Sequence, residues 1–213
     1  MRNLLTFALV LVMAGSALAQ LPNSMGIFFA EDEFTPATTN LDPEPGVSFE
    51  MYVAIVNTTV NFVGAYECGL EVSDPSLFVL GWGGPDATWE EGEYVYPDGF
   101  SYGGFNFGDN FNHIAGFQYP LPTYGEATVL SQMQLLFSGT SLVEFHMGPA
   151  EPSSVGGAGP AITNGLDPEE IIVCNYTSGP GFGGLVGTLY GQGIEFPVAT
   201  ETQSWSGVKA LFE

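Results

Sequence analysis

Residues 45–72 read PGVSFEMYVAIVNTTVNFVGAYECGLEV, and this stretch decides the fold. After the Pro-Gly turn, apolar side chains recur at every second position over 47–57. A second run, over 63–72, alternates apolar side chains with glutamates. Successive side chains of a β-strand point to opposite faces, so a period of two predicts strands with one buried face. The stretch therefore predicts two β-strands, the second of which places Cys68 on the core side.

Further runs of this kind follow along the chain, separated by clusters of glycine and proline. We expect strands at 77–82, 114–119, 126–137, 142–147 and 171–176, with turns at 83–85, 156–160 and 178–184. Within 126–137 the alternation places Ala127, Val129, Met133, Leu135 and Phe137 inward, and Gln132 and Gln134 outward. A strand with one apolar face needs a second sheet to cover it. We therefore expect an all-β, two-sheet β-sandwich with few or no long helices.

The charge balance of the chain is one-sided. Its 213 residues include 24 Asp and Glu against two Lys and Arg, which gives a net charge of −22. Binding to nucleic acid or to anionic lipid relies on Lys and Arg to neutralise phosphates. We therefore expect no nucleic-acid partner and no binding to an anionic membrane surface. The 29 Gly and 17 Phe are typical of an all-β protein with many turns, and unlike a disordered acidic tail.

The first residues have the pattern of a secretory signal peptide. Arg2 precedes an apolar run at 4–13, and Ala17-Leu18-Ala19 forms a small-x-small cleavage site. The apolar run is shorter than the roughly 18–20 residues that a membrane span needs. We expect a signal peptide at 1–19, a sandwich domain at 20–198, and a tail at 199–213 that forms a short docked helix or a surface-attachment tag. The predicted location is outside the cell, either secreted or associated with the cell surface.

Two cysteines, Cys68 and Cys174, lie far apart in the sequence within strand-like runs. In an exported protein such a pair most often forms a disulfide. The alternative is a pair of buried free thiols.

Four short segments resemble cohesin-type modules and the related sandwiches of carbohydrate-binding modules. They are PGV at 45–47, VGAY at 63–66, SDPSLFV at 73–79 and EATVL at 126–130. The resemblance covers residues 45–147. It implies an immunoglobulin-like or jelly-roll β-sandwich on an extracellular bacterial protein, used for attachment to a partner rather than for catalysis. The chain departs from cohesins in a long aromatic insertion between residues 81 and 111.

That insertion is the sequence feature most suggestive of a ligand. Aromatic rings stack on sugar rings, and the neighbouring carboxylates and amides can bind hydroxyl groups. The candidate ligand-binding residues are Trp82, Trp89, Tyr94, Tyr96 and Tyr102. A polysaccharide is thus the alternative to an extracellular protein partner. A loop that buries its own rings, or a protein-contact patch, would have the same composition.

Two further kinds of site match short parts of the sequence. Asp167, Glu169 and Glu170 offer hard oxygen ligands for a weak extracellular Ca²⁺ site, with solvated acidic loops as the alternative. Residues 99–103, GFSYG, match the G-x-S-x-G elbow of serine hydrolases around Ser101, but the GFNFG that follows is unsuited to the helix that the elbow requires. A hydrolase is therefore a remote alternative. We expect a secreted, non-catalytic binding or structural module.

Overall fold

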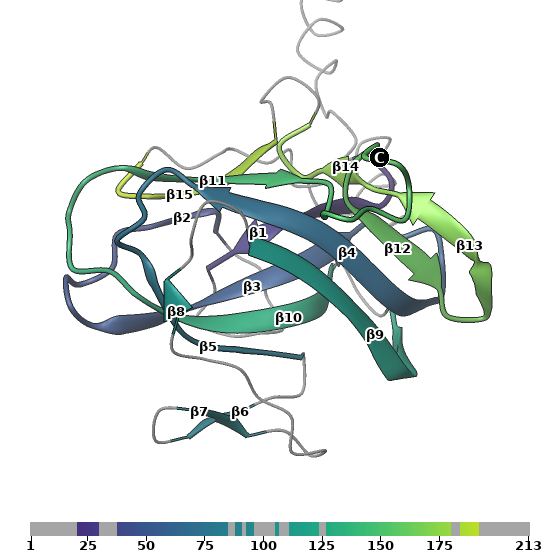
Figure 1. The fold of residues 1–213 in the computed structure, drawn as a ribbon, viewed down its shortest axis with the longest axis horizontal. Helices are drawn as coiled ribbons and strands as arrows, with labels where there is room; N and C mark the ends of the chain where they lie inside the picture. Colours follow the sequence, from purple (N-terminus) through teal and green to yellow (C-terminus); the bar gives the residue numbers. More distant parts are fainter. Residues whose placement is uncertain are drawn as a thin grey trace, which may run out of the picture. The chain divides into compact units, whose positions relative to one another are not determined.

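The computed structural model describes residues 21–29, 38–84, 88–90, 93–95, 105–106, 111–123, 127–179 and 184–191. These residues form strands, turns and loops, and none of them belongs to a helix that could cross a membrane. The strands build two stacked sheets with the hydrophobic core between them (Figure 1). The predicted two-sheet β-sandwich is thereby confirmed. The predicted signal peptide, 1–19, and tail, 199–213, lie outside the described residues.

Sheet 1 is built around the strand that follows the Pro-Gly turn. Its strands lie in the order β14 (Asn175–Tyr176), β1 (Ser24–Phe28), β3 (Ser48–Val56), β10 (Ala127–Leu136), β5 (Phe78–Gly83) and β8 (Phe105–Asn106). Neighbouring strands are antiparallel except β1 and β14, which are parallel. Gly46 has a φ of 78°, a backbone conformation that glycine adopts without steric cost, and it turns the chain into β3.

Sheet 2 is built around β4 (Phe62–Val72), the second strand of the opening stretch. Hydrogen bonding links its strands one after another as β13 (Asp167–Val173), β12 (Ala161–Asn164), β4, β11 (Val143–Gly148), β15 (Leu185–Leu189) and β2 (Asn40–Leu41), and β9 (Phe111–Pro122) also pairs with β4. Apart from the two sheets, β6 (Thr88–Glu90) and β7 (Glu93–Val95) pair with each other.

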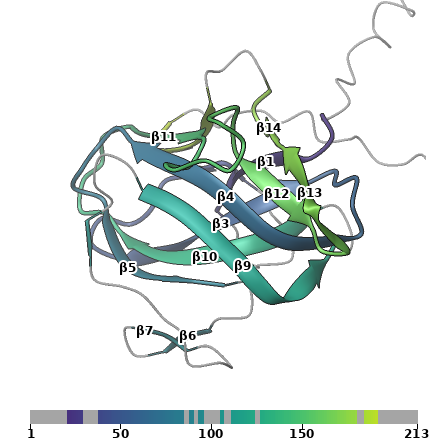
Figure 2. The ribbon, with the colours of Figure 1, turned by 45° about the vertical axis from the view of Figure 1, so that its right-hand side comes forward.

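One edge of β4 is shared by two strands that lie end to end. Gly69 pairs with Gly148 of β11 on one side and with Asn112 of β9 on the other. Farther along, Glu67 pairs with Ala161 of β12 on one side and with β9 on the other. β11 and β12 therefore follow the same edge of β4, opposite β9 (Figure 2). Between them the chain leaves the sheet and returns to it, and we call this segment the 149–160 loop.

The core confirms the predicted alternation in both strands of the opening stretch. Met51, Val53 and Ile55 of β3, together with Cys68 and Leu70 of β4, are completely buried. The next strand, β5, follows a turn in which Asp74 accepts hydrogen bonds from the Ser76 hydroxyl and the Ser76 amide. These bonds lower the pKa of Asp74, because they favour its charged form.

The inward pattern expected for β10 is wrong at its first two positions, Ala127 and Val129. Met133, Leu135 and Phe137 lie in the core as predicted, but Leu130 is buried there in place of Val129. Ala127 pairs with Val56, beside the inward pair of Thr128 and Ile55, so it faces outward and is only half-buried. Pairing with β3 skips from Val129 to Ser131, so Leu130 is the extra residue of a β-bulge. A bulge shifts the side-chain alternation by one residue, which a strict period of two cannot anticipate. Gln132 and Gln134 face away from the core as predicted, although both are buried.

The predicted disulfide is absent, since Cys68 and Cys174, both within the described residues, are free thiols. Ala161 pairs with Glu67 on one side and with Val173 on the other, so β12 lies between the two cysteines. Two strand spacings amount to about 10 Å, whereas a disulfide joins Cα atoms about 4.4–6.8 Å apart. Burial raises the pKa of both thiols, that of Cys174 to about 12, which keeps them protonated and unreactive.

Candidate functional site

The outward surface of sheet 2 presents an open band of small and apolar side chains. Gly116, Ala65, Thr163 and Ile171 are partners in register across β9, β4, β12 and β13. Their neighbours Tyr66 and Ile162 point into the core, so this band faces outward. Ile114 extends it along β9 and is 52% exposed, while Ile171 is 42% exposed. We call Ile114, Gly116, Ala65, Thr163 and Ile171 the exposed row.

The next outward row is covered by the 149–160 loop. Here Glu67, Ala161 and Val173 are in register across β4, β12 and β13, and Ile114 of the exposed row is the partner of Glu67 on β9. Its outer members are open, but Glu67 is only 8% exposed and Ala161 only 1%. The loop contacts this row directly, because the Ser153 hydroxyl and the Ser154 amide donate to the Glu67 carboxylate.

Two polar side chains of the sheet fix the loop in place. The Glu67 carboxylate accepts bonds of 2.9 and 3.1 Å from the Ser154 amide and 3.1 Å from the Ser153 hydroxyl. Asn112 of β9 donates from Nδ2 to the Glu151 carbonyl at 2.9 Å and accepts at Oδ1 from the Glu151 amide at 3.0 Å. A nearly buried carboxylate is costly unless hydrogen-bonded, so these contacts both satisfy Glu67 and position the loop.

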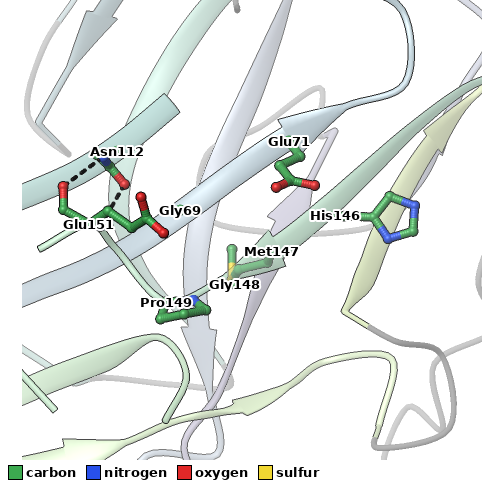
Figure 3. A pocket seen from close by; sticks show the side chains of 8 residues that line it. All are labelled: Gly69, Glu71, Asn112, His146, Met147, Gly148, Pro149 and Glu151. Atoms are coloured by element: carbon green, nitrogen blue, oxygen red, sulfur yellow. Dashed lines mark hydrogen bonds between the residues drawn. The ribbon is translucent and has the colours of Figure 1, made fainter. Parts of the chain in front are cut away.

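On the other side of the loop from the exposed row lies a hollow of about 250 Å³, shown in Figure 3. Gly69 and Gly148, which are partners in register, supply a floor without side chains. Glu71 and His146, also partners in register, border it on the sheet side. Asn112 and Glu151 border it on the other side. We call this hollow, with Met147 and Pro149 completing its lining, the acidic groove.

The groove lies beside a further negative charge, and no Lys or Arg is present among the described residues. Glu144 lies 3.7 Å from His146 of the groove, between Oε2 and Nε2. The two Lys and Arg of the chain, Arg2 and Lys209, both lie outside the described residues. Within the described part of the chain, histidine is therefore the only side chain that can carry positive charge near these carboxylates.

The aromatic residues predicted to bind a ligand do not form one described platform. Trp82 packs against the core, with its ring edge-on to His113 at a centroid distance of 5.0 Å. Trp89 and Tyr94 are direct partners in register between β6 and β7. Tyr96 and Tyr102 lie outside the described residues. Trp82 is thus partly buried against the core, and ligand binding by all five residues stays a prediction.

The predicted metal ligands are not gathered around one point. Asp167, Glu169 and Glu170 lie on β13 and are exposed. Asp167 accepts from the Glu169 amide and Glu170 accepts from the Asn164 side chain, so two of the carboxylates serve the β12–β13 hairpin. Across the described residues, no three His, Cys, Asp or Glu side chains are placed to hold a metal ion. Calcium binding by these three residues stays a prediction.

His113 cannot serve as the base that a serine hydrolase needs. His113 is fully buried, with Nδ1 3.4 Å from the Tyr66 hydroxyl and 3.5 Å from the Ser131 hydroxyl. Burial lowers the pKa of His113 to about 3, so the ring is neutral and has no access to a substrate. Ser101 lies outside the described residues.

Sequence reasoning placed Glu67 and Glu71 on the outward face of β4 but missed the groove itself. Asn112, Gly148 and Glu151 come from three separate segments, which only the pairing of β9 and β11 with β4 brings together. The glycine-rich composition of 156–160 did predict an irregular segment there, without its fold back over Glu67.

No protein-family model matches the chain, and no curated protein matches it. Its fold is similar to solved cohesin modules. One is the sixth cohesin of scaffoldin B from Acetivibrio cellulolyticus, in complex with a mutant Cel5 dockerin (11% identity, 81% of this chain and 100% of that chain, TM-score 0.46). Another is the second type II cohesin of the ScaA adaptor scaffoldin of the same organism (13% identity, 85% of this chain and 98% of that chain, TM-score 0.44). A third is the type I cohesin of the OlpA–Doc918 complex from Clostridium thermocellum (9% identity, 78% of this chain and 98% of that chain, TM-score 0.42). All three are cohesin modules, the class that the short sequence segments resemble.

Proposed function

We propose that the protein is a secreted, non-catalytic module that holds a protein partner outside the cell through the outward face of sheet 2. The observation that carries the proposal is the exposed row, in which Ile114 and Ile171 stay open to water on a rigid sheet. Gly116, which has no side chain, and the small Ala65 lie between them. Apolar side chains grouped on one open face are typical of protein contacts.

The net negative charge of the chain indicates the surface charge that its partner should have. A net charge of −22 opposes pairing with a second copy of the chain. The partner proposed here therefore presents aliphatic side chains at its centre and Lys or Arg at its rim. Complementary charge around an apolar centre is the usual arrangement in protein interfaces, where it speeds association.

The test uses the immobilised full chain and proteins released from the cell surface of its source organism. A retained protein with a basic surface is purified, and its dissociation constant is measured by calorimetry. The variant Ile114→Ser/Ile171→Ser should weaken binding by at least tenfold. Leu142→Ser is the matched control, because Leu142 is 51% exposed but lies in the turn before β11. Equal affinity of the double variant and the wild type would refute the proposal.

A polysaccharide ligand is the second candidate, since Trp89 and Tyr94 are direct partners in register between β6 and β7. Aromatic rings are the groups that stack on sugar rings. A glycan array, run with calcium and again with chelator, tests it. Binding lost in Trp89→Ala or Tyr94→Ala would favour the sugar, and a blank array would leave the protein partner.

A further inference from the structure

The acidic groove is the right size for one side chain. Its volume of about 250 Å³ lies below the roughly 300–1,000 Å³ that small-molecule sites occupy, and it is far larger than the roughly 30 Å³ that one water takes up. The backbone of the floor is accessible to a ligand, because a Cβ atom added at Gly148 would meet no atom within 4 Å. By contrast, a Cβ atom at Gly69 would lie 2.6 Å from the Pro149 carbonyl oxygen. The open end of the floor is therefore at Gly148.

The walls of the groove select a planar cation. Glu71 belongs to β4 and Glu151 to the 149–160 loop, so their carboxylates border the groove from two directions (Figure 3). A guanidinium has five donors in one plane and can bond to acceptors on both sides, whereas an ammonium acts as a single point charge. A flat group also lies close against a floor of glycine backbone.

The loop that forms one wall is held rigidly enough to define the groove. Asn112 binds both the amide and the carbonyl of Glu151, and Glu67 holds Ser153 and Ser154 a few residues later. Prearranged acceptors cost a ligand less entropy than acceptors that must be ordered on binding. The groove is therefore present before any partner arrives.

We infer that the acidic groove receives an arginine side chain of the protein partner, beside the exposed row that contacts the partner's apolar centre. The inference rests on the proposed function, and it names the residue type of the partner that sets the partner's orientation on sheet 2. An arginine on one side of the 149–160 loop and apolar contacts on the other would fix how the partner lies across sheet 2.

The test is an NMR titration of ¹⁵N-labelled protein, expressed as the full chain, with N-acetyl-argininamide. We expect saturable shifts of the Gly69, Asn112, Gly148 and Glu151 amides, and at least threefold weaker binding of N-acetyl-lysinamide. Gly148→Val should abolish the shifts, because its side chain fills the groove while suiting a β-strand. Glu71→Gln and Glu151→Gln should each weaken binding several-fold.

Glu169→Gln is the matched control, because it removes the same charge from exposed β13, away from the groove. Shifts spread over all acidic segments, equal binding of the lysine analogue, or unchanged binding to Gly148→Val would each overturn the inference. These failures are separate from failure of the proposed function. A partner that binds Gly148→Val normally but not Ile114→Ser/Ile171→Ser would keep the function and discard the groove.

Discussion

His113 is fully buried between the two sheets, where Tyr66, Ser131 and Trp82 surround its ring. The hydroxyl groups of Tyr66 and Ser131 lie on the Nδ1 side, so a neutral ring can accept from them. A protonated ring would lose this acceptor and would place a charge in the core. A polar residue in this position makes the core sensitive to acid.

The folded protein should lose stability as the pH falls below 6.5. Burial lowers the pKa of His113 from 6.5 to about 3, so over this range the unfolded chain binds a proton that the folded chain does not. The free energy of unfolding then falls by about 1.4 kcal/mol for each pH unit, or by about 2–3 kcal/mol between pH 6.5 and 4.5. Urea unfolding across this range should show this fall with pH in the wild type and a much smaller fall in His113→Gln. The same substitution at partly exposed His146 is the control, and equal slopes for wild type and His113→Gln would contradict the prediction.

Among the elements, the strands that bury one face were predicted well and the segments that depend on tertiary pairing were not. β3 and β4 were found within a residue or two, because alternation alone defines them. Short strands such as β2 and β12 lack enough residues to show a period, and their pairing partners decide that they are strands. The bulge at Leu130 and the acidic groove likewise arise from contacts between segments far apart in the sequence.

The 149–160 loop should depend on Glu67 for its position. Glu67→Ala removes the acceptor of the Ser153 and Ser154 donors, and hydrogen bonds to charged groups contribute about 1.5–3 kcal/mol each. We expect the free energy of unfolding to fall by about 1–3 kcal/mol, because water can replace part of the lost contact. Amide exchange at residues 153–155 should accelerate at least tenfold.

Glu71→Ala is the matched control for this loop, since Glu71 lies on the same strand and the same face but is exposed. It should leave exchange at 153–155 unchanged. Exchange that rises equally in both variants would show that the loop is held by something other than Glu67.

At the scale of the whole molecule, the large net negative charge comes from the scarcity of Lys and Arg more than from an excess of Asp and Glu. Only 12% of residues are charged, yet the net charge is −22 because just two residues are basic. Repulsion between like charges destabilises a compact state and is weakened by salt. The same repulsion keeps copies of the chain apart, which agrees with the proposed binding of a different partner.

Added salt should therefore stabilise the protein. We expect Tm in differential scanning calorimetry to rise by several degrees between 10 mM and 300 mM NaCl at pH 7.5, because the Debye length falls from about 30 Å to below 8 Å. Sodium and potassium chloride should act equally, since screening depends on ionic strength alone. A constant or falling Tm would mean that repulsion does not limit stability.

The end-to-end arrangement of β11 and β12 has a consequence for how the surface can change over evolution. The 149–160 loop leaves β4 at Gly148 and returns to it at Ala161, and both ends are anchored by the ladder of the same strand. Doubling the length of such a loop costs only about 0.6 kcal/mol in closure entropy. Insertions and deletions there can therefore reshape one wall of the groove while the sandwich below stays the same. Changes confined to the 149–160 loop can therefore alter which partners such a chain binds.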